Sequence, residues 1–180
     1  MDLGLKGRKA IITGGSRGLG RAAAETLASE GCDVAICSLG ADGVEEAKKS
    51  LEAKGVKVFA RAVDVGDKEA LESFIADAIE DLGGLDILVS NPSGGNGVDE
   101  AAWKANFEVD MMGAVRSANA AVKALSQSDA ASIIFISSTA AVETFMGPTS
   151  YNAIKAALLT HSNGLSQALE CVRSAALIAL

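Results

Sequence analysis

The stretch Ala10-Ile11-Ile12-Thr13-Gly14-Gly15-Ser16-Arg17-Gly18-Leu19-Gly20 begins as an apolar strand, passes through a glycine-rich turn and leads into a helix predicted over residues 21–30. Glycine permits positive φ and a close approach of the backbone to a ligand. The N-terminus of the following helix adds free N–H groups and a partial positive charge, which suit a phosphate. Gly14, Gly18 and Gly20 therefore predict a phosphate-binding turn, with a ligand-free tight turn as the alternative.

Short apolar runs alternate with longer amphipathic stretches along the rest of the chain. Strands separated by helices of this length indicate βαβ units and a parallel sheet covered on both faces. We therefore expect an α/β fold with a Rossmann-type doubly wound parallel sheet, in a single dinucleotide-binding domain over residues 1–180. The predicted strands are 10–12, 33–37, 56–60, 85–89 and 133–136, and the predicted helices are 21–30, 44–54, 68–82 (capped by Asp67), 103–125 and 150–169.

Composition excludes several classes of function. The 180 residues are 49% hydrophobic and carry a net charge of −7, which indicates a globular chain and argues against nucleic-acid or anionic membrane partners. No apolar run approaches the roughly 18 residues of a membrane span, and the N-terminus has no apolar signal core, so a cytoplasmic location is expected. Cys32, Cys37 and Cys171 form no C-x-x-C pair, and His161 is the only histidine. We expect buried reduced thiols and no metal site.

Tyr151 and Lys155 are four residues apart in a predicted helix and so share one face of it. An ammonium beside a phenol favours the phenolate, and a free tyrosine, which titrates near pH ~10, needs such help for acid–base work at neutral pH. Ser137 and Ser138 end the strand that precedes this helix. The pattern indicates a proton donor that works beside a redox cofactor, with an ordinary helix-surface pair as the alternative.

The end of the second strand bears on the choice of cofactor. Folds that bind NAD often place an acid there to hold the adenosine ribose, but the sequence reads Ile36-Cys37-Ser38-Leu39-Gly40, and Asp42 is expected later, in a loop. Arg17 and the hydroxyls of Ser16 and Ser38 can instead meet a 2′-phosphate. This favours NADP, with NAD possible; the alternative for Arg17 is a solvated turn residue.

Two further polar residues follow strands. Asp64 comes just after the third strand and can accept a hydrogen bond from an adenine amino group, or it is an ordinary loop aspartate. Asn91 closes the fourth strand before Pro92. Its amide can brace the glycine turn or line the cofactor cleft, and an ordinary Asx turn is the alternative.

Taken together, these motifs resemble the short-chain dehydrogenase/reductase family, in the subgroup that includes the 3-oxoacyl-carrier-protein reductases. The resemblance covers about residues 5–168. It implies that Tyr151 donates a proton to a substrate carbonyl, that Ser138 binds the carbonyl oxygen, and that Lys155 binds the nicotinamide ribose and favours ionisation of the tyrosine. It implies a carbonyl reduction, of a 3-oxoacyl group or another ketone, or the reverse reaction. The matching residues are Thr13, Gly14, Gly18, Gly20, Asp64, Val65, Asn91, Ser138, Tyr151 and Lys155.

The sequence departs from the family at two internal places. Asp110 stands where members usually have an asparagine whose main-chain carbonyl anchors a water linked to the lysine. Asp110 is therefore a possible fourth member of the catalytic set. The usual Asn-Ala-Gly after the fourth strand is replaced by Asn91-Pro92-Ser93-Gly94, which can reshape the floor of the cleft.

The C-terminal part also differs from the family pattern. Members continue into a sixth strand, a Pro-Gly turn and a substrate lid, whereas residues 171–180 are an apolar tail with no Pro-Gly. We expect the family's last strand or strands and its lid to be lacking, with the tail as a partial sixth strand or a continued helix. The alternative function is accordingly a truncated nucleotide-binding or interaction subunit without catalysis.

The family commonly forms dimers of dimers through the long helix and the Tyr-Lys helix, and we expect a homodimer or homotetramer. Alanines give these two helices small faces that would allow close packing between subunits. The alternative is packing within one chain. The alanines are Ala118, Ala120, Ala121, Ala156 and Ala157.

Overall fold

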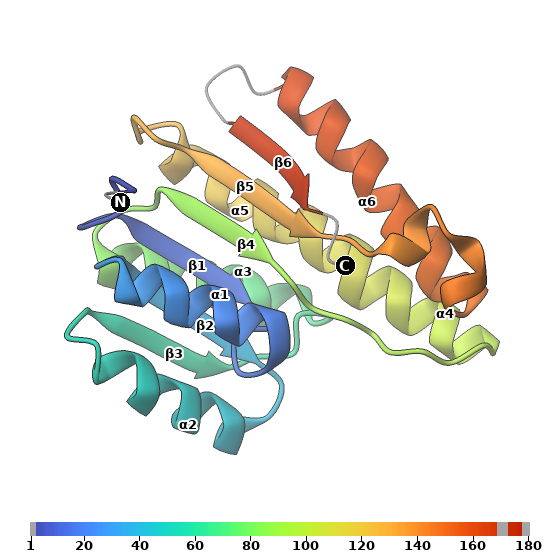
Figure 1. The fold of residues 1–180 in the computed structure, drawn as a ribbon, viewed down its shortest axis with the longest axis horizontal. Helices are drawn as coiled ribbons and strands as arrows, with labels where there is room; N and C mark the ends of the chain where they lie inside the picture. The colour runs from blue at the N-terminus through green and yellow to red at the C-terminus, as the bar shows by residue number, and fades with distance from the viewer. Residues whose placement is uncertain (1–2, 169–172, 178–180) are drawn as a thin grey trace.

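A six-stranded parallel sheet forms the centre of the computed structural model, which describes residues 3–168 and 173–177. The strand order is β3-β2-β1-β4-β5-β6, with helices on both faces (Figure 1). The strands are β1 (Lys9–Thr13), β2 (Asp33–Ser38), β3 (Val58–Ala62), β4 (Ile87–Ser90), β5 (Ser132–Ile136) and β6 (Arg173–Leu177). The helices are α1 (Gly18–Ser29), α2 (Ala41–Glu52), α3 (Lys68–Leu82), α4 (Glu100–Asn106), α5 (Gly113–Leu125) and α6 (Thr149–Ala168). The predicted doubly wound parallel sheet is confirmed.

Strand β1 lies in the middle and pairs on both sides. Ala10 is in register with Val34 of β2 and with Ile87 of β4. Successive side chains of β1 point to opposite faces of the sheet. Ile12 packs with α1 and α2 on one face, and Ile11 packs with α3 and α5 on the other. Because helices cover both faces, nearly every strand position is apolar.

The helix that was predicted over residues 103–125 has a different form. It begins at Glu100, capped by the Asp99 carboxylate, which accepts a hydrogen bond of 2.9 Å from the Ala102 N–H. A π-helical turn over Phe107–Met112 then separates α4 from α5. A π turn inserts an extra residue and changes which side chains point inward, and such turns are frequent at functional sites.

Other boundaries shift by a few residues. Strand β3 lies two residues later than predicted, because the pairing of Val58 with Val34 sets its register. Asp42, expected in a loop, lies in the first turn of α2. Helix α1 begins at Gly18, so Leu19 and Gly20 are already helical. The predicted cap of α3 is confirmed, since Asp67 accepts a hydrogen bond of 3.0 Å from the Ala70 N–H.

Of the two alternatives for the apolar tail, the strand is the one observed. Residues Arg173–Leu177 form β6, parallel to β5, with Ser132 opposite Arg173. Within the described ranges, no helix has both the length and the apolar character needed to cross a membrane.

The predicted burial of two thiols is confirmed. Cys32 and Cys37 are free and buried, and burial raises the pKa of Cys37 to about 12 and that of Cys32 to about 11. Cys171 lies outside the described residues.

The alanine faces are partly used within the chain. Ala118 and Ala121 lie on the face of α5 that packs into the core and are buried there, so they are not available to a second subunit. Ala120, Ala156 and Ala157 are half-buried. Assembly into a homodimer or homotetramer stays a prediction.

Partial burial of His161 predicts a pH-dependent stability. Its ring lies 5.4 Å from that of Phe135 between centroids, and desolvation lowers the His161 pKa below its usual value of 6.5. The unfolded chain therefore binds the proton more readily, and stability falls as the pH drops below about 6.5. Urea unfolding should show a smaller loss between about pH 7.5 and 5.5 for His161→Leu than for the unsubstituted chain. Equal losses in the two proteins would show that His161 does not contribute.

Candidate functional site

The glycine turn packs directly against the end of β4. Gly14 has a φ of +67°, and a Cβ there would lie 2.6 Å from the Asn91 carbonyl oxygen. A Cβ on Gly20 would lie 2.3 Å from the Gly14 carbonyl oxygen. The Asn91 side chain donates a hydrogen bond of 3.2 Å to that same oxygen. Asn91 thus braces the glycine turn, which was one of its predicted roles, and only glycine fits at positions 14 and 20.

A cavity of about 870 Å³ opens beside this turn. Most of the predicted cofactor residues line it, together with several that the sequence did not single out, among them Leu39, Gly40 and Gly43. The predicted residues in the lining are Gly14, Ser16, Arg17, Gly18, Leu19, Ser38, Asp64, Val65 and Asn91. Gly20 lies just behind the lining, in the first turn of α1.

The N-terminus of α1 opens onto this cavity without a cap. No side chain caps the helix, and its first turn, all of it within the described residues, contains no acid. The first N–H groups of a helix have no partner inside it and carry a partial positive charge. An anion in the cavity can therefore be bound by backbone groups.

The other polar residues of the lining have different surroundings. The Ser38 hydroxyl accepts a hydrogen bond of 3.2 Å from the Ser16 N–H, which ties the end of β2 to the glycine turn. Asp64 is exposed and accepts a bond of 2.9 Å from the Gly66 N–H, so it closes a local turn as well as lining the cavity. Arg17 is exposed. Leu39, 75% exposed, follows the last residue of β2, in the stretch 36–40 that contains no carboxylate.

Lys155 lies buried at the edge of this region. Its side chain is 4% exposed, and its Nζ lies 2.8 Å from Asp110 Oδ1. The ammonium also donates to the Ile136 carbonyl at 3.1 Å and to the Pro92 carbonyl at 3.5 Å. Pro92 belongs to the cavity lining, so Lys155 connects α6 to the wall of the cavity.

Tyr151 and Ser137 both contact this lysine, and Ser138 directly follows Ser137 in the chain. The half-buried Tyr151 ring has its centroid 5.6 Å from Lys155 Nζ. Ser137 donates a buried hydrogen bond of 2.8 Å to the Lys155 carbonyl, which fastens the end of β5 to α6. Ser138 caps the 3₁₀ turn Thr139–Ala141, because its hydroxyl accepts a hydrogen bond of 3.1 Å from the Ala140 N–H. The structure therefore brings the predicted catalytic residues to one edge of the sheet.

Two supporting residues were not predicted. Asn152 donates hydrogen bonds to the carbonyls of Thr144 at 2.7 Å and Gly147 at 2.9 Å, which shapes the loop before α6. Ser150 donates to the Gly97 carbonyl at 2.9 Å. Their signal in the sequence is weak: polar residues on either side of Tyr151 read as ordinary first-turn residues of a helix.

Gly20→Ala tests the close packing of the turn. The added methyl would meet the Gly14 carbonyl, so we expect a loss of about 1–3 kcal/mol in the free energy of unfolding, measured by urea denaturation. Gly40→Ala is the matched control, because a Cβ there has nothing within 4 Å. It should change stability by less than about 0.5 kcal/mol. Equal effects of the two substitutions would refute the packing.

The sequence of this chain is similar to those of known enzymes. The family model for the short chain dehydrogenases matches residues 8–173. Isoepoxydon dehydrogenase patN from Penicillium expansum is 34% identical over 174 residues, which are 94% of this chain and 67% of that protein.

Two solved structures are also similar. L-sorbose reductase from Gluconobacter frateurii, complexed with NADPH and L-sorbose, has a TM-score of 0.90 at 34% identity, over 97% of this chain and 68% of that one. A short chain dehydrogenase from Mycobacterium paratuberculosis bound to NAD has a TM-score of 0.86 at 26% identity, over 92% of this chain and 68% of that one. This chain thus spans about two thirds of the length of these relatives. It belongs to the short-chain dehydrogenase family.

Proposed function

We propose that this chain is an NADP(H)-dependent oxidoreductase that interconverts a ketone and an alcohol, with Tyr151 as the proton donor. The observation that carries the proposal is the buried Lys155 ammonium, 5.6 Å from the Tyr151 ring and bonded to a carbonyl in the wall of the 870 Å³ cavity. A site for a nucleotide and a site for proton transfer are thereby adjacent.

The cavity fits a dinucleotide. Gly18 lines the cavity, and a Cβ built there would have nothing within 4 Å, so the backbone is open to a phosphate-bearing ligand. The uncapped N-terminus of α1 favours the negative charge of such a ligand. Asp64 and Val65 would hold the adenine, and Asn91 would keep the floor of the cavity in place. When bound, the cofactor supplies the hydride chemistry.

The site favours NADP over NAD. A 2′-phosphate would be neutralised by Arg17, which is exposed beside the cavity, and would meet the Ser38 hydroxyl. The stretch 36–40 at the end of β2 contains no carboxylate that would bind a free ribose hydroxyl and repel a phosphate. The relatives include an NADPH complex and an NAD complex, so the argument for NADP rests on these side chains.

Proton transfer would use the residues at the end of β5 and the start of α6. Tyr151 would donate its proton to the substrate oxygen, and the Ser138 hydroxyl would bind that oxygen as negative charge develops on it. The Lys155 ammonium would stabilise the phenolate that remains. Ser137 would help to position Lys155, because the Ser137 hydroxyl donates a hydrogen bond to the Lys155 backbone carbonyl.

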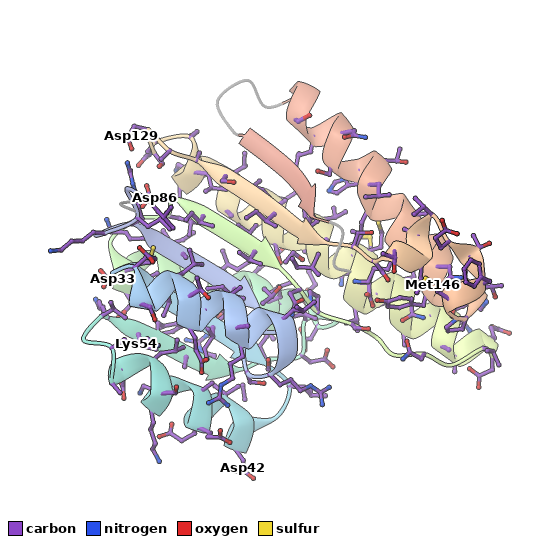
Figure 2. The ribbon with its side chains drawn as sticks, viewed as in Figure 1. Asp33, Asp42, Lys54, Asp86, Asp129 and Met146 are labelled. Carbon is purple, nitrogen blue, oxygen red and sulfur yellow. The ribbon has the colours of Figure 1, made fainter. Side chains whose placement is uncertain are left out.

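The segment between β5 and α6, which precedes Tyr151 in the chain, favours a ketone with an apolar substituent. Three apolar side chains are exposed in the segment between β5 and α6: Val142 is 60% exposed, Phe145 84% and Met146 58%. Figure 2 shows Met146 at the side of the molecule away from Asp86 and Asp129, which lie at the amino ends of the strands. A 3-oxoacyl thioester is one substrate of this class.

Tyr151→Phe tests the proposed acid. Loss of the hydroxyl should lower kcat by about 10²-fold or more, because general acid catalysis is removed, while NADPH affinity changes by less than about twofold. NADPH absorbance with a panel of ketones and 3-oxoacyl thioesters measures the rate, and nucleotide fluorescence measures binding. Thr160→Val, which removes an exposed hydroxyl from the same helix, is the control.

Undiminished turnover in Tyr151→Phe would exclude this tyrosine as the acid. A folded unsubstituted chain that binds NADPH but reduces none of the substrates would favour a nucleotide-binding subunit without catalysis.

A further inference from the structure

The Asp110 carboxylate contacts two positive or hydrogen-bond-donating groups from different parts of the chain. It lies in the π turn between α4 and α5 and is 1% exposed. Its Oδ1 is 2.8 Å from Lys155 Nζ, an ion pair whose angles are not those of a hydrogen bond. Its Oδ2 accepts a hydrogen bond of 2.6 Å from the Gly94 N–H. One side chain thus joins α6 to the segment that follows β4.

This arrangement requires a carboxylate rather than an amide. A carboxylate offers two acceptor oxygens, whereas an asparagine offers one oxygen and one NH₂ donor. An asparagine at position 110 would therefore turn its NH₂ toward either the Lys155 ammonium or the Gly94 N–H, and one contact would become repulsive. It would also leave the ammonium buried without a counter-charge.

The backbone of Gly94, whose N–H donates to Asp110, is itself tightly packed. A Cβ there would lie 2.6 Å from the Ala105 carbonyl oxygen, so the backbone is packed against the end of α4 and its N–H direction is fixed. Gly94 lines the cavity, as does Pro92, whose carbonyl accepts from Lys155 at 3.5 Å. The Asp110–Lys155 pair therefore contacts the segment 92–94 at both ends, Lys155 at the Pro92 carbonyl and Asp110 at the Gly94 N–H.

We propose that Asp110 is a positioning residue whose carboxylate couples Lys155 to the Pro92–Gly94 wall of the cavity, so that nucleotide affinity and proton transfer depend on one buried ion pair. This inference rests on the proposed function for its catalytic consequence, but the coupling itself is a property of the ligand-free chain.

A double-mutant cycle in the ligand-free protein measures the coupling. Asp110→Asn leaves a lone buried ammonium, Lys155→Met leaves a lone buried carboxylate, and the double variant has neither charge. Each single substitution should lower the urea midpoint of unfolding, and the double variant should lower it by less than the sum of the two. If a single variant fails to fold, folding of the double variant supports the coupling. Additive losses, or a double variant that also fails to fold, would overturn it.

Nucleotide binding and turnover test the positioning role. Asp110→Asn should bind NADPH several-fold more weakly, by fluorescence titration, and its kcat at saturating NADPH should fall by about tenfold or more, because Lys155 is displaced. Glu108→Gln is the matched control: it neutralises another acid of the same π turn, one that pairs with Arg116 at 2.9 Å, and both constants should stay within about twofold.

A purely structural Asp110 would lower the urea midpoint and leave the NADPH affinity and kcat of the folded variant unchanged, which would overturn the proposal. If the unsubstituted chain shows no turnover, the proposed function fails. The coupling is then tested by the unfolding and NADPH-binding measurements alone.

Discussion

The pairing of β1 with both β2 and β4 is the constraint on which the site depends. The chain moves outward from β1 to β2 and β3 and then returns to β4 on the other side of β1, so the helices that follow β1 and β4 cover opposite faces. The loops at the carboxyl ends of these two strands diverge, and a crevice remains between them. The glycine turn and the segment 91–94 both line the cavity found there.

A second consequence is that a buried ion pair lies beside this crevice. Burying the Lys155 ammonium and the Asp110 carboxylate has a desolvation cost that their attraction repays only with good geometry, and removal of one partner typically costs about 3–5 kcal/mol. The Ile136 and Pro92 carbonyls and the Gly94 N–H supply the further partners that such a pair needs. These contacts join α6 to the segment 92–94 at the edge of the cavity.

Local patterns were enough to predict much of this from the sequence. Apolar runs separated by amphipathic helices predicted the parallel sheet, and Asp67 predicted a helix start. The features that sequence reasoning missed depend on contacts between distant segments. The start of β3 follows from its register with Val34, and the two-sided contact of Asp110 requires a π turn that no local propensity indicates.

Transfer of a labelled hydride tests the central claim most directly. Deuterium placed at C4 of NADPH, on each face of the ring in turn, can be followed by mass spectrometry into the alcohol formed from a panel of apolar ketones. We predict that deuterium from one face alone appears on the carbinol carbon of at least one product. An NADPH complex that transfers deuterium to no substrate, or a folded chain that binds no NADPH, would contradict the account.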